Sequence, residues 1–318
     1  MKSALVLLTL VTVGPCFAQG GTGSWCATPA SRAEIEEQVA FQVSQRPARP
    51  ALETRSRSAL PTEIVRARLD GDVSIRGATE RDWWASKYRF FPSRTIPYKF
   101  SNAVSEDDKK LFKKATEMWS SLMKLTFKEV TSNPKRLYIE VSTSIADKCS
   151  WTDAYATSGD MRQRIQLADC KTRKNPMVSV AHEIGHALGL DHEQLRPDRS
   201  TYLTIDKDAI KEKVRSQYAA DFWEDLLNPL FHRGIGDYNL LSVMQYSRWQ
   251  GPPKGSSHPA FDLTDVGTKR LEEQTDVKDP DVDQYVGQRE CITLLDVVSV
   301  EEIFSGKPDD IAPSLAMR

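Results

Sequence analysis

Three of the chain's five histidines, His182, His186 and His192, lie within eleven residues of one another. In a helix, His182 and His186 are one turn apart on the same face, so their imidazoles can bind one metal ion. Gly189 can adopt a left-handed conformation that ends this helix and brings His192 to the same ion. Three neutral imidazoles leave a tetrahedral Zn²⁺ with one position for water. Glu183, next to His182, is placed to take a proton from that water, so the pattern HExxHxxGxxH predicts a catalytic zinc site with Glu183 as general base.

A single histidine on an apolar helix face is more often a core residue whose ring is satisfied by a backbone group. Here five specified positions match at once, which chance would produce with a probability on the order of 10⁻⁸ per starting position. The metal interpretation is therefore the stronger one. His232 and His258 are left without a role.

The extended motif resembles that of the metzincin superfamily of zinc endopeptidases, which implies a Met-turn beneath the zinc. The segment LSVMQY, with Met244 at its centre, is similar to that turn. Two flanking residues resemble the astacin family within it: Glu193 directly follows the third histidine, and Tyr246 lies two residues after the methionine. The resemblance implies that Tyr246 is an additional zinc ligand that swings away to stabilise the oxyanion, as a hydrogen-bond donor can. It also implies that Glu193 is linked to the new N-terminus of the mature enzyme.

Upstream, the segment LDGD at residues 69–72 resembles the FxGD motif of astacin propeptides, with Leu69 in place of Phe. The resemblance implies that Asp72 binds the zinc in a zymogen, since a carboxylate is a competent zinc ligand. An activating protease would then cut between Asp72 and the strand that begins near residue 95. The candidate sites are Arg76, Arg81 and Lys87.

Two departures from the astacin pattern are present. Gln245 stands where the family commonly has His, and the cysteine usual near the segment KLTF is absent. A matrixin-like metzincin is the alternative within the superfamily, because GHALGLDH also resembles that branch. Matrixins, however, use a Pro-Arg-Cys-Gly switch that this chain lacks, and they have no Tyr at the Met-turn.

An alternative from another class is a catalytically inactive zinc-binding or adhesion protein that keeps the fold. Loss of the general base would be its signature, and Glu183 is present. The favoured interpretation is a zinc endopeptidase that acts on a protein or peptide substrate. The astacin resemblance implies that an extended peptide lies antiparallel to an edge strand near residues 150–157, where Trp151 and Tyr155 line subsites.

The remaining patterns predict an α+β domain that positions this motif. Strands are predicted at 95–100, 125–130, 136–142 and 162–168, and helices at 105–123, 175–190 and 294–304. The stretch between the second and third helices has no clear periodicity and is predicted to be irregular. The resemblance implies a metzincin-like catalytic domain, with a twisted mixed sheet, the active-site helix above, and an irregular lower subdomain with a C-terminal helix.

The N-terminus predicts export. Lys2 is followed by the apolar run ALVLLTLVTV and by Ala18 at a suitable cleavage position, as in a secretory signal peptide. The run is about half the roughly 20 residues needed to cross a bilayer. The predicted organisation is a signal peptide at 1–18, a propeptide with a Pro/Arg-rich tether at 19–76, a peptidase domain at 77–306 and a polar tail at 307–318. We expect a secreted protein without a membrane anchor.

Four cysteines remain after Cys16 leaves with the signal, and an oxidising compartment favours two disulfides among them. Three pairings are possible. Cys149 with Cys170 closes a short loop and is preferred, which leaves Cys26 with Cys291, although those two could also stay unpaired. Only the first bridge matches the astacin pattern. The second would keep a cleaved propeptide attached.

The overall charge excludes one class of function. The 318 residues contain 43 Lys and Arg against 44 Asp and Glu, for a net charge of −1 without a block of one sign. Binding nucleic acid by neutralising phosphates requires a large basic excess, so we expect no nucleic-acid partner. The chain is expected to be a monomer.

Overall fold

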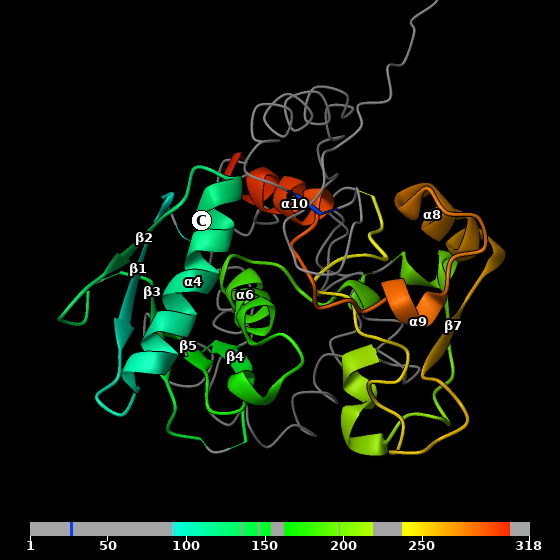
Figure 1. Ribbon diagram of the computed structural model, residues 1–318, viewed down its shortest axis with the longest axis horizontal. Coiled ribbons are helices and arrows are strands. Elements are labelled where there is room, and N and C mark those ends of the chain that lie inside the picture. The colour runs from blue at the N-terminus through cyan, green and yellow to red at the C-terminus, as the bar shows by residue number, and fades with distance from the viewer. Residues whose placement is uncertain are drawn as a thin grey trace, which may run out of the picture.

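The computed structural model describes residues 26–27, 91, 93–134, 136–145, 147–153, 162–196, 198–218 and 237–305. The predicted signal peptide, the tether, Asp72, Tyr155, His232 and the tail lie outside these residues. Two regions lie side by side in Figure 1. We call residues 93–190 the sheet region, and residues 192–218 and 237–293 the turn-rich region.

A mixed five-stranded sheet forms the base of the sheet region, as predicted. Its strands lie in the order β2-β1-β3-β5-β4. β1, β2, β3 and β5 pair in parallel, whereas β4 pairs with β5 in the antiparallel direction and forms one edge. The bounds are β1 Thr95–Phe100, β2 Thr126–Glu129, β3 Tyr138–Ser142, β4 Ser150–Asp153 and β5 Arg162–Gln166.

Two helices pack with this sheet, close to their predicted bounds. α4 (Glu106–Leu122) begins at Ser105, whose hydroxyl accepts the N–H of Asp108. α6 (Pro176–Ala187) begins at Asn175 and has Pro in its first turn. The indole Nε1 of Trp119 on α4 donates to the carbonyl of Ala181 on α6 at 3.0 Å, so the metal-motif helix is held by both apolar packing and a buried hydrogen bond.

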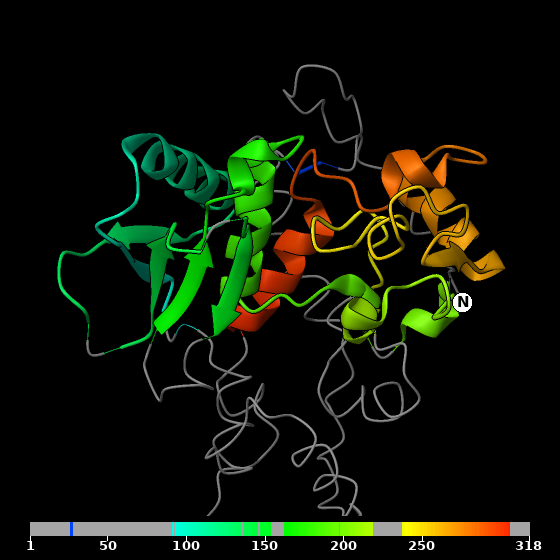
Figure 2. The same cartoon turned by 90° about the horizontal axis from the view of Figure 1, so that it is seen from below.

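The C-terminal helix α10 (Leu294–Ser305) lies between the two regions in both views (Figures 1 and 2). Its residues Val297, Val298 and Val300 belong to the same core cluster as the sheet and α4. Among the described residues, none of the helices combines the length and the apolar character that a membrane crossing requires.

The turn-rich region corrects one prediction, because it contains regular elements where none was expected. β6 (Leu203–Ile205) pairs with β7 (Phe261–Leu263), and α8 (Asp265–Thr275) and the short α9 (Val282–Tyr285) follow. On α8 only Gly267, Leu271 and Thr275 are buried, so its apolar stripe is too thin to stand out in the sequence. Strands of three residues are likewise too short to show alternation. The 3-10 helices are η4 Cys170–Thr172, η5 Glu193–Leu195, η6 Arg199–Thr201 and η7 Glu212–Tyr218.

Both predicted disulfides are confirmed, Cys149–Cys170 and Cys26–Cys291. Cys26 also forms an isolated antiparallel bridge with Thr293, and the N–H of Ala27 donates to the carbonyl of Ile292 at 3.0 Å. Ala27 is buried in the core of the sheet region. Residues 26 and 27 are therefore built into the folded domain, although they precede it by more than sixty residues.

Candidate metal centre

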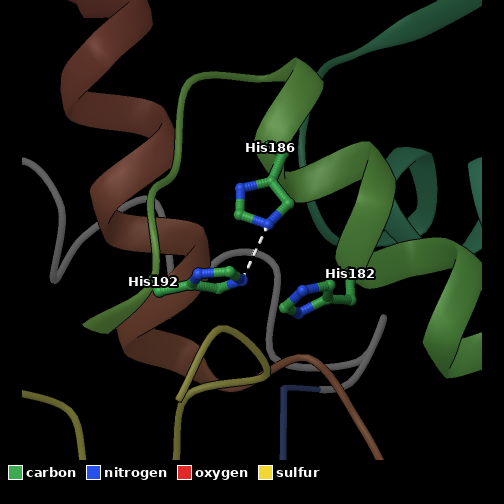
Figure 3. A group of neighbouring side chains, drawn as sticks. All are labelled: His182, His186 and His192. Carbon is green, nitrogen blue, oxygen red and sulfur yellow. Dashed lines mark hydrogen bonds between the residues drawn. The ribbon is translucent and has the colours of Figure 1, made fainter. Parts of the chain in front are cut away.

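The three predicted histidine ligands converge on one point (Figure 3). His182 and His186 project from α6, which ends at Ala187. Gly189 then adopts φ 106°, its N–H bonds the carbonyl of His186, and the N–H of Leu190 bonds the carbonyl of Gly185. This is a Schellman turn, which ends the helix three residues earlier than predicted and returns the chain toward it. His192 follows directly, and one ligand atom of each ring lies within 4.8 Å of the others.

The hydrogen bonds of the two histidines on α6 fit zinc binding. Nδ1 of His182 contacts the carbonyl of Val243 at 2.8 Å, and Nδ1 of His186 contacts the carbonyl of Leu190 at 2.9 Å. A carbonyl can only accept, so both Nδ1 atoms carry the proton and both Nε2 atoms keep a lone pair for a metal.

The spacing and the charge state of the rings also suit a metal. Nε2 of His186 and Nε2 of His192 are 3.1 Å apart. Two nitrogens bound to one tetrahedral zinc lie roughly 3.3 Å apart. Burial lowers the pKa of His182 and of His186, which keeps these rings in the neutral form that a metal requires.

Glu183 lies on the side of α6 that faces the edge strand β4. Its carboxylate accepts a hydrogen bond from the backbone N–H of Trp151, and its side chain is buried. Burial raises the pKa of Glu183 to about 7, opposed by that N–H and by the charge of Arg289. The indole of Trp151 stacks beside the ring of His186, with centroids 5.6 Å apart. β4 therefore borders both the metal ligands and the predicted base.

The predicted Met-turn packs against α6 between its two histidines. A Cβ atom on Gly185 would lie 2.8 Å from Sδ of Met244, so the absence of a side chain at Gly185 makes room for the methionine. Tyr246 leaves this turn with its ring 4.2 Å from the ring of His192. Burial raises the pKa of Tyr246 to about 12, which keeps its hydroxyl protonated and able to donate.

Glu193 lies beside the centre with its side chain 13% exposed, so it is not an ordinary exposed surface residue. Its Oε1 accepts the N–H of Asn239 at 2.8 Å and lies 3.4 Å from the guanidinium of Arg196. Burial raises the pKa of Glu193 to about 8, and the charge of Arg196 opposes this shift.

Two charged residues near the site, the half-buried Arg289 and the buried Asp296, were not predicted. Arg289 donates from Nη1 to the carbonyls of Gln245 at 3.0 Å and Gln288 at 2.9 Å. Its positive charge opposes the rise that burial gives to the pKa of Glu183 and of Tyr246. Asp296, on α10, contacts the Met-turn through Ser242. A lone aspartate within the apolar helix LLDVV was the available signal for Asp296, and nothing in the sequence around Arg289 marked it.

Comparison with known proteins gives consistent matches. The model of one family, the Astacin peptidase family, matches residues 84–305. The chain is 30% identical over 190 residues to Nematocyst expressed protein 6 of Nematostella vectensis, covering 59% of each protein. It is 30% identical over 228 residues to Zinc metalloproteinase nas-36 of Caenorhabditis elegans, covering 70% of this chain and 32% of that protein. It therefore spans about a third to three fifths of the length of these two relatives.

A further relative and one solved structure are also similar. Astacin-like metalloprotease toxin 2 of Loxosceles intermedia is 30% identical over 197 residues, covering 60% of this chain and 70% of the toxin. The solved structure is high choriolytic enzyme 1, a hatching enzyme zinc-protease from Oryzias latipes. It aligns with a TM-score of 0.49 and 18% identity, covering 70% of this chain and 98% of that one.

Proposed function

Because the chain belongs to the astacin family of zinc peptidases, we propose that it is a zinc-dependent endopeptidase that cleaves protein or peptide substrates. One observation supports this most strongly. His182, His186 and His192 converge from two segments, with Glu183 buried beside them and Tyr246 against the third ring. A bound zinc ion would supply Lewis-acid chemistry, lowering the pKa of a water and polarising the scissile carbonyl.

The residues of the chain would supply the remaining steps. Glu183 would take the proton from the attacking water and deliver it to the leaving amine, as a buried carboxylate with a pKa near neutrality can do. The protonated hydroxyl of Tyr246 would donate a hydrogen bond to the oxyanion that develops on the substrate carbonyl. Met244 would support the histidines from below. An inactive adhesion protein would have no need of Glu183 in this position.

The edge strand β4 offers a place for the substrate backbone. Within the part of the chain that the structure describes, β4 pairs with β5 on one side only, and an extended peptide can add to such an edge through main-chain hydrogen bonds. Trp151 on this strand lies beside His186, so a peptide bound there would run past the metal ligands.

The experiment that tests the activity compares the processed wild-type chain with Glu183→Gln on casein. We expect hydrolysis by the wild type that a zinc chelator abolishes and added zinc restores. Glu183→Gln should bind zinc in full and lose activity by about 10³-fold, within the range for loss of a general base. Glu290→Gln, the same change at an exposed position, is the matched control and should be fully active. Absence of chelator-sensitive hydrolysis in the wild type would refute the proposal.

The same proposal includes secretion as a zymogen, with Asp72 as the latency ligand and an activating protease. The two disulfides support an oxidising compartment. Cys26 precedes Asp72 in the chain and is bonded to Cys291, so cleavage between residues 72 and 95 would yield two chains joined by that bridge.

Gel electrophoresis and N-terminal sequencing of the secreted, activated protein test this arrangement. We expect one band without reductant and two bands with it, and a first N-terminus near residue 19. Cys291→Ser should release the smaller fragment without reductant, whereas Cys149→Ser, which breaks the other bridge, should not. Release of the fragment from the activated wild type without reductant would contradict the two-chain enzyme.

A further inference from the structure

One peptide group of the Met-turn, between Val243 and Met244, forms a hydrogen bond with Nδ1 of His182. The carbonyl of Val243 accepts from Nδ1 of His182 at 2.8 Å. The N–H of the same peptide group, that of Met244, donates to Oγ of Ser242 at 2.9 Å. The Ser242 hydroxyl in turn donates to Oδ1 of Asp296 at 2.5 Å. An unbroken series of hydrogen bonds therefore joins a carboxylate on α10 to a metal ligand on α6.

Asp296 accepts hydrogen bonds from several donors besides Ser242. It also accepts from the N–H of Val243 at 3.1 Å, from the N–H and hydroxyl of Thr293, both at 2.9 Å, and from Nδ2 of Asn239 at 3.3 Å. Asp296 is 3% exposed, and its neighbours on α10 are mostly apolar. An apolar residue would leave these buried donors without their acceptor, so the carboxylate ties the Met-turn to the start of α10.

We propose that Asp296 is a positioning residue for the metal centre, acting on His182 through Ser242 and the Val243–Met244 peptide group. Hydrogen bonds in series polarise one another, so the carboxylate strengthens each acceptor along the path. The Val243 carbonyl then holds the Nδ1 proton of His182 more strongly, which fixes the ring and makes Nε2 a better ligand. A carboxylate bonded directly to a zinc-binding histidine acts in the same way. This inference rests on the zinc site of the proposed function.

His186 provides an internal contrast. Its Nδ1 contacts the carbonyl of Leu190, in the Schellman turn that follows its own helix. That partner is set by local geometry, whereas the partner of His182 depends on α10, more than a hundred residues further along the chain. Docking of α10 is therefore a condition for a well-ordered first ligand.

The test measures the zinc dissociation constant of the full processed chain by competition with a chromophoric chelator. Ser242→Ala and Asp296→Asn should each weaken zinc binding by about 10-fold to 100-fold, the range for outer partners of zinc ligands. The zinc affinity of the double variant should equal that of the more severely affected single variant, because both changes break the same path. Ser242→Thr keeps a hydroxyl and should restore tight binding.

Ser179→Ala is the matched control. Ser179 is a buried serine on α6 itself, and its hydroxyl donates to the carbonyl of Asn175 instead of entering the path. Its zinc affinity should stay within about 2-fold of wild type. Circular dichroism and thermal unfolding of the zinc-free proteins show which variants are folded, and Ser242→Ala decides the question if Asp296→Asn does not fold.

Two failures are distinguishable. Wild-type zinc affinity in folded Ser242→Ala would overturn the positioning role of Asp296 and leave the zinc site intact. A wild-type chain that binds no zinc would overturn the proposed function itself.

Discussion

The two regions of the molecule position their active-site residues by different means. In the sheet region, His182, Glu183 and His186 lie on one helix, and their spacing follows from helix geometry. That helix is held by apolar packing against α4 and the sheet. In the turn-rich region, Met244 and Tyr246 lie on a turn whose backbone groups bond to buried side chains instead of to neighbouring strands.

Gln288 illustrates how the turn-rich region is held. Its Nε2 donates to the carbonyls of Leu241 at 2.8 Å and Cys291 at 2.9 Å, and its Oε1 accepts the N–H groups of Glu290 and Cys291. A buried backbone group outside helices and sheets must find a partner, and here side chains supply it. We therefore expect substitutions in the core of the sheet region to lower the free energy of unfolding only. Substitutions in the turn-rich region should also change zinc affinity or catalysis.

The largest effect on stability is expected from the sheet core. Phe112 is fully buried on α4 and packs against Tyr98 and Phe100. Phe112→Ala should lower the free energy of unfolding by about 4 kcal/mol because it leaves a cavity. The folded fraction should keep wild-type zinc affinity. Denaturant unfolding and zinc titration measure the two quantities. A loss of zinc affinity in the folded variant would show that the sheet core also positions the metal ligands.

A large effect on catalysis with little effect on stability is expected from Tyr246→Phe. Loss of one oxyanion donor should lower kcat by about 10²-fold, or about 2.7 kcal/mol in the barrier. Unfolding should change by less than about 0.5 kcal/mol, because the ring remains. Tyr202→Phe, which alters a tyrosine stacked on Tyr238 instead, is the control and should keep wild-type kcat. Equal kcat for Tyr246→Phe and wild type would remove Tyr246 from the mechanism.

A smaller effect that combines stability and site is expected from Gln288→Ala. Its backbone partners would lose their hydrogen bonds, at a cost of about 2 kcal/mol. Because these partners adjoin the Met-turn, zinc affinity should fall as well. Gln284→Ala, at an exposed position on α9, should change neither quantity. Lower stability with unchanged zinc affinity would show that a substitution in the turn-rich region acts on stability alone, as one in the sheet core is expected to do.

The smallest effect is expected where the regions touch, at Gly185 and Met244. Gly185→Ala should destabilise by about 1 kcal/mol, because crowding against Sδ outweighs the gain in helix propensity. In a Met244→Ala background the same change should be neutral or stabilising. A double-mutant cycle measured by thermal unfolding gives this coupling, and additive effects would exclude the contact as its cause.

The elements of the sheet region were predictable because their signals are local. A strand alternates, a helix repeats every 3.6 residues, and Gly189 marks the end of α6, so the bounds differ from prediction by only a few residues. Counting four cysteines left three pairings, and the short loop between Cys149 and Cys170 favoured the one that the structure shows. α8 and the β6–β7 pair were missed, because a thin apolar stripe and three-residue strands carry little periodicity.

The sequence by itself was enough to predict that His182, His186 and His192 come together as candidate metal ligands, because their spacing is a property of one helix and the turn after it. Only the tertiary structure decided what holds them. Asp296 and Arg289 reach the site from segments more than forty residues beyond the Met-turn, and the fit of Met244 against Gly185 joins residues of both regions. The physical reason is that helix spacing is set by local backbone geometry, whereas the partners of buried polar groups are set by how distant segments pack.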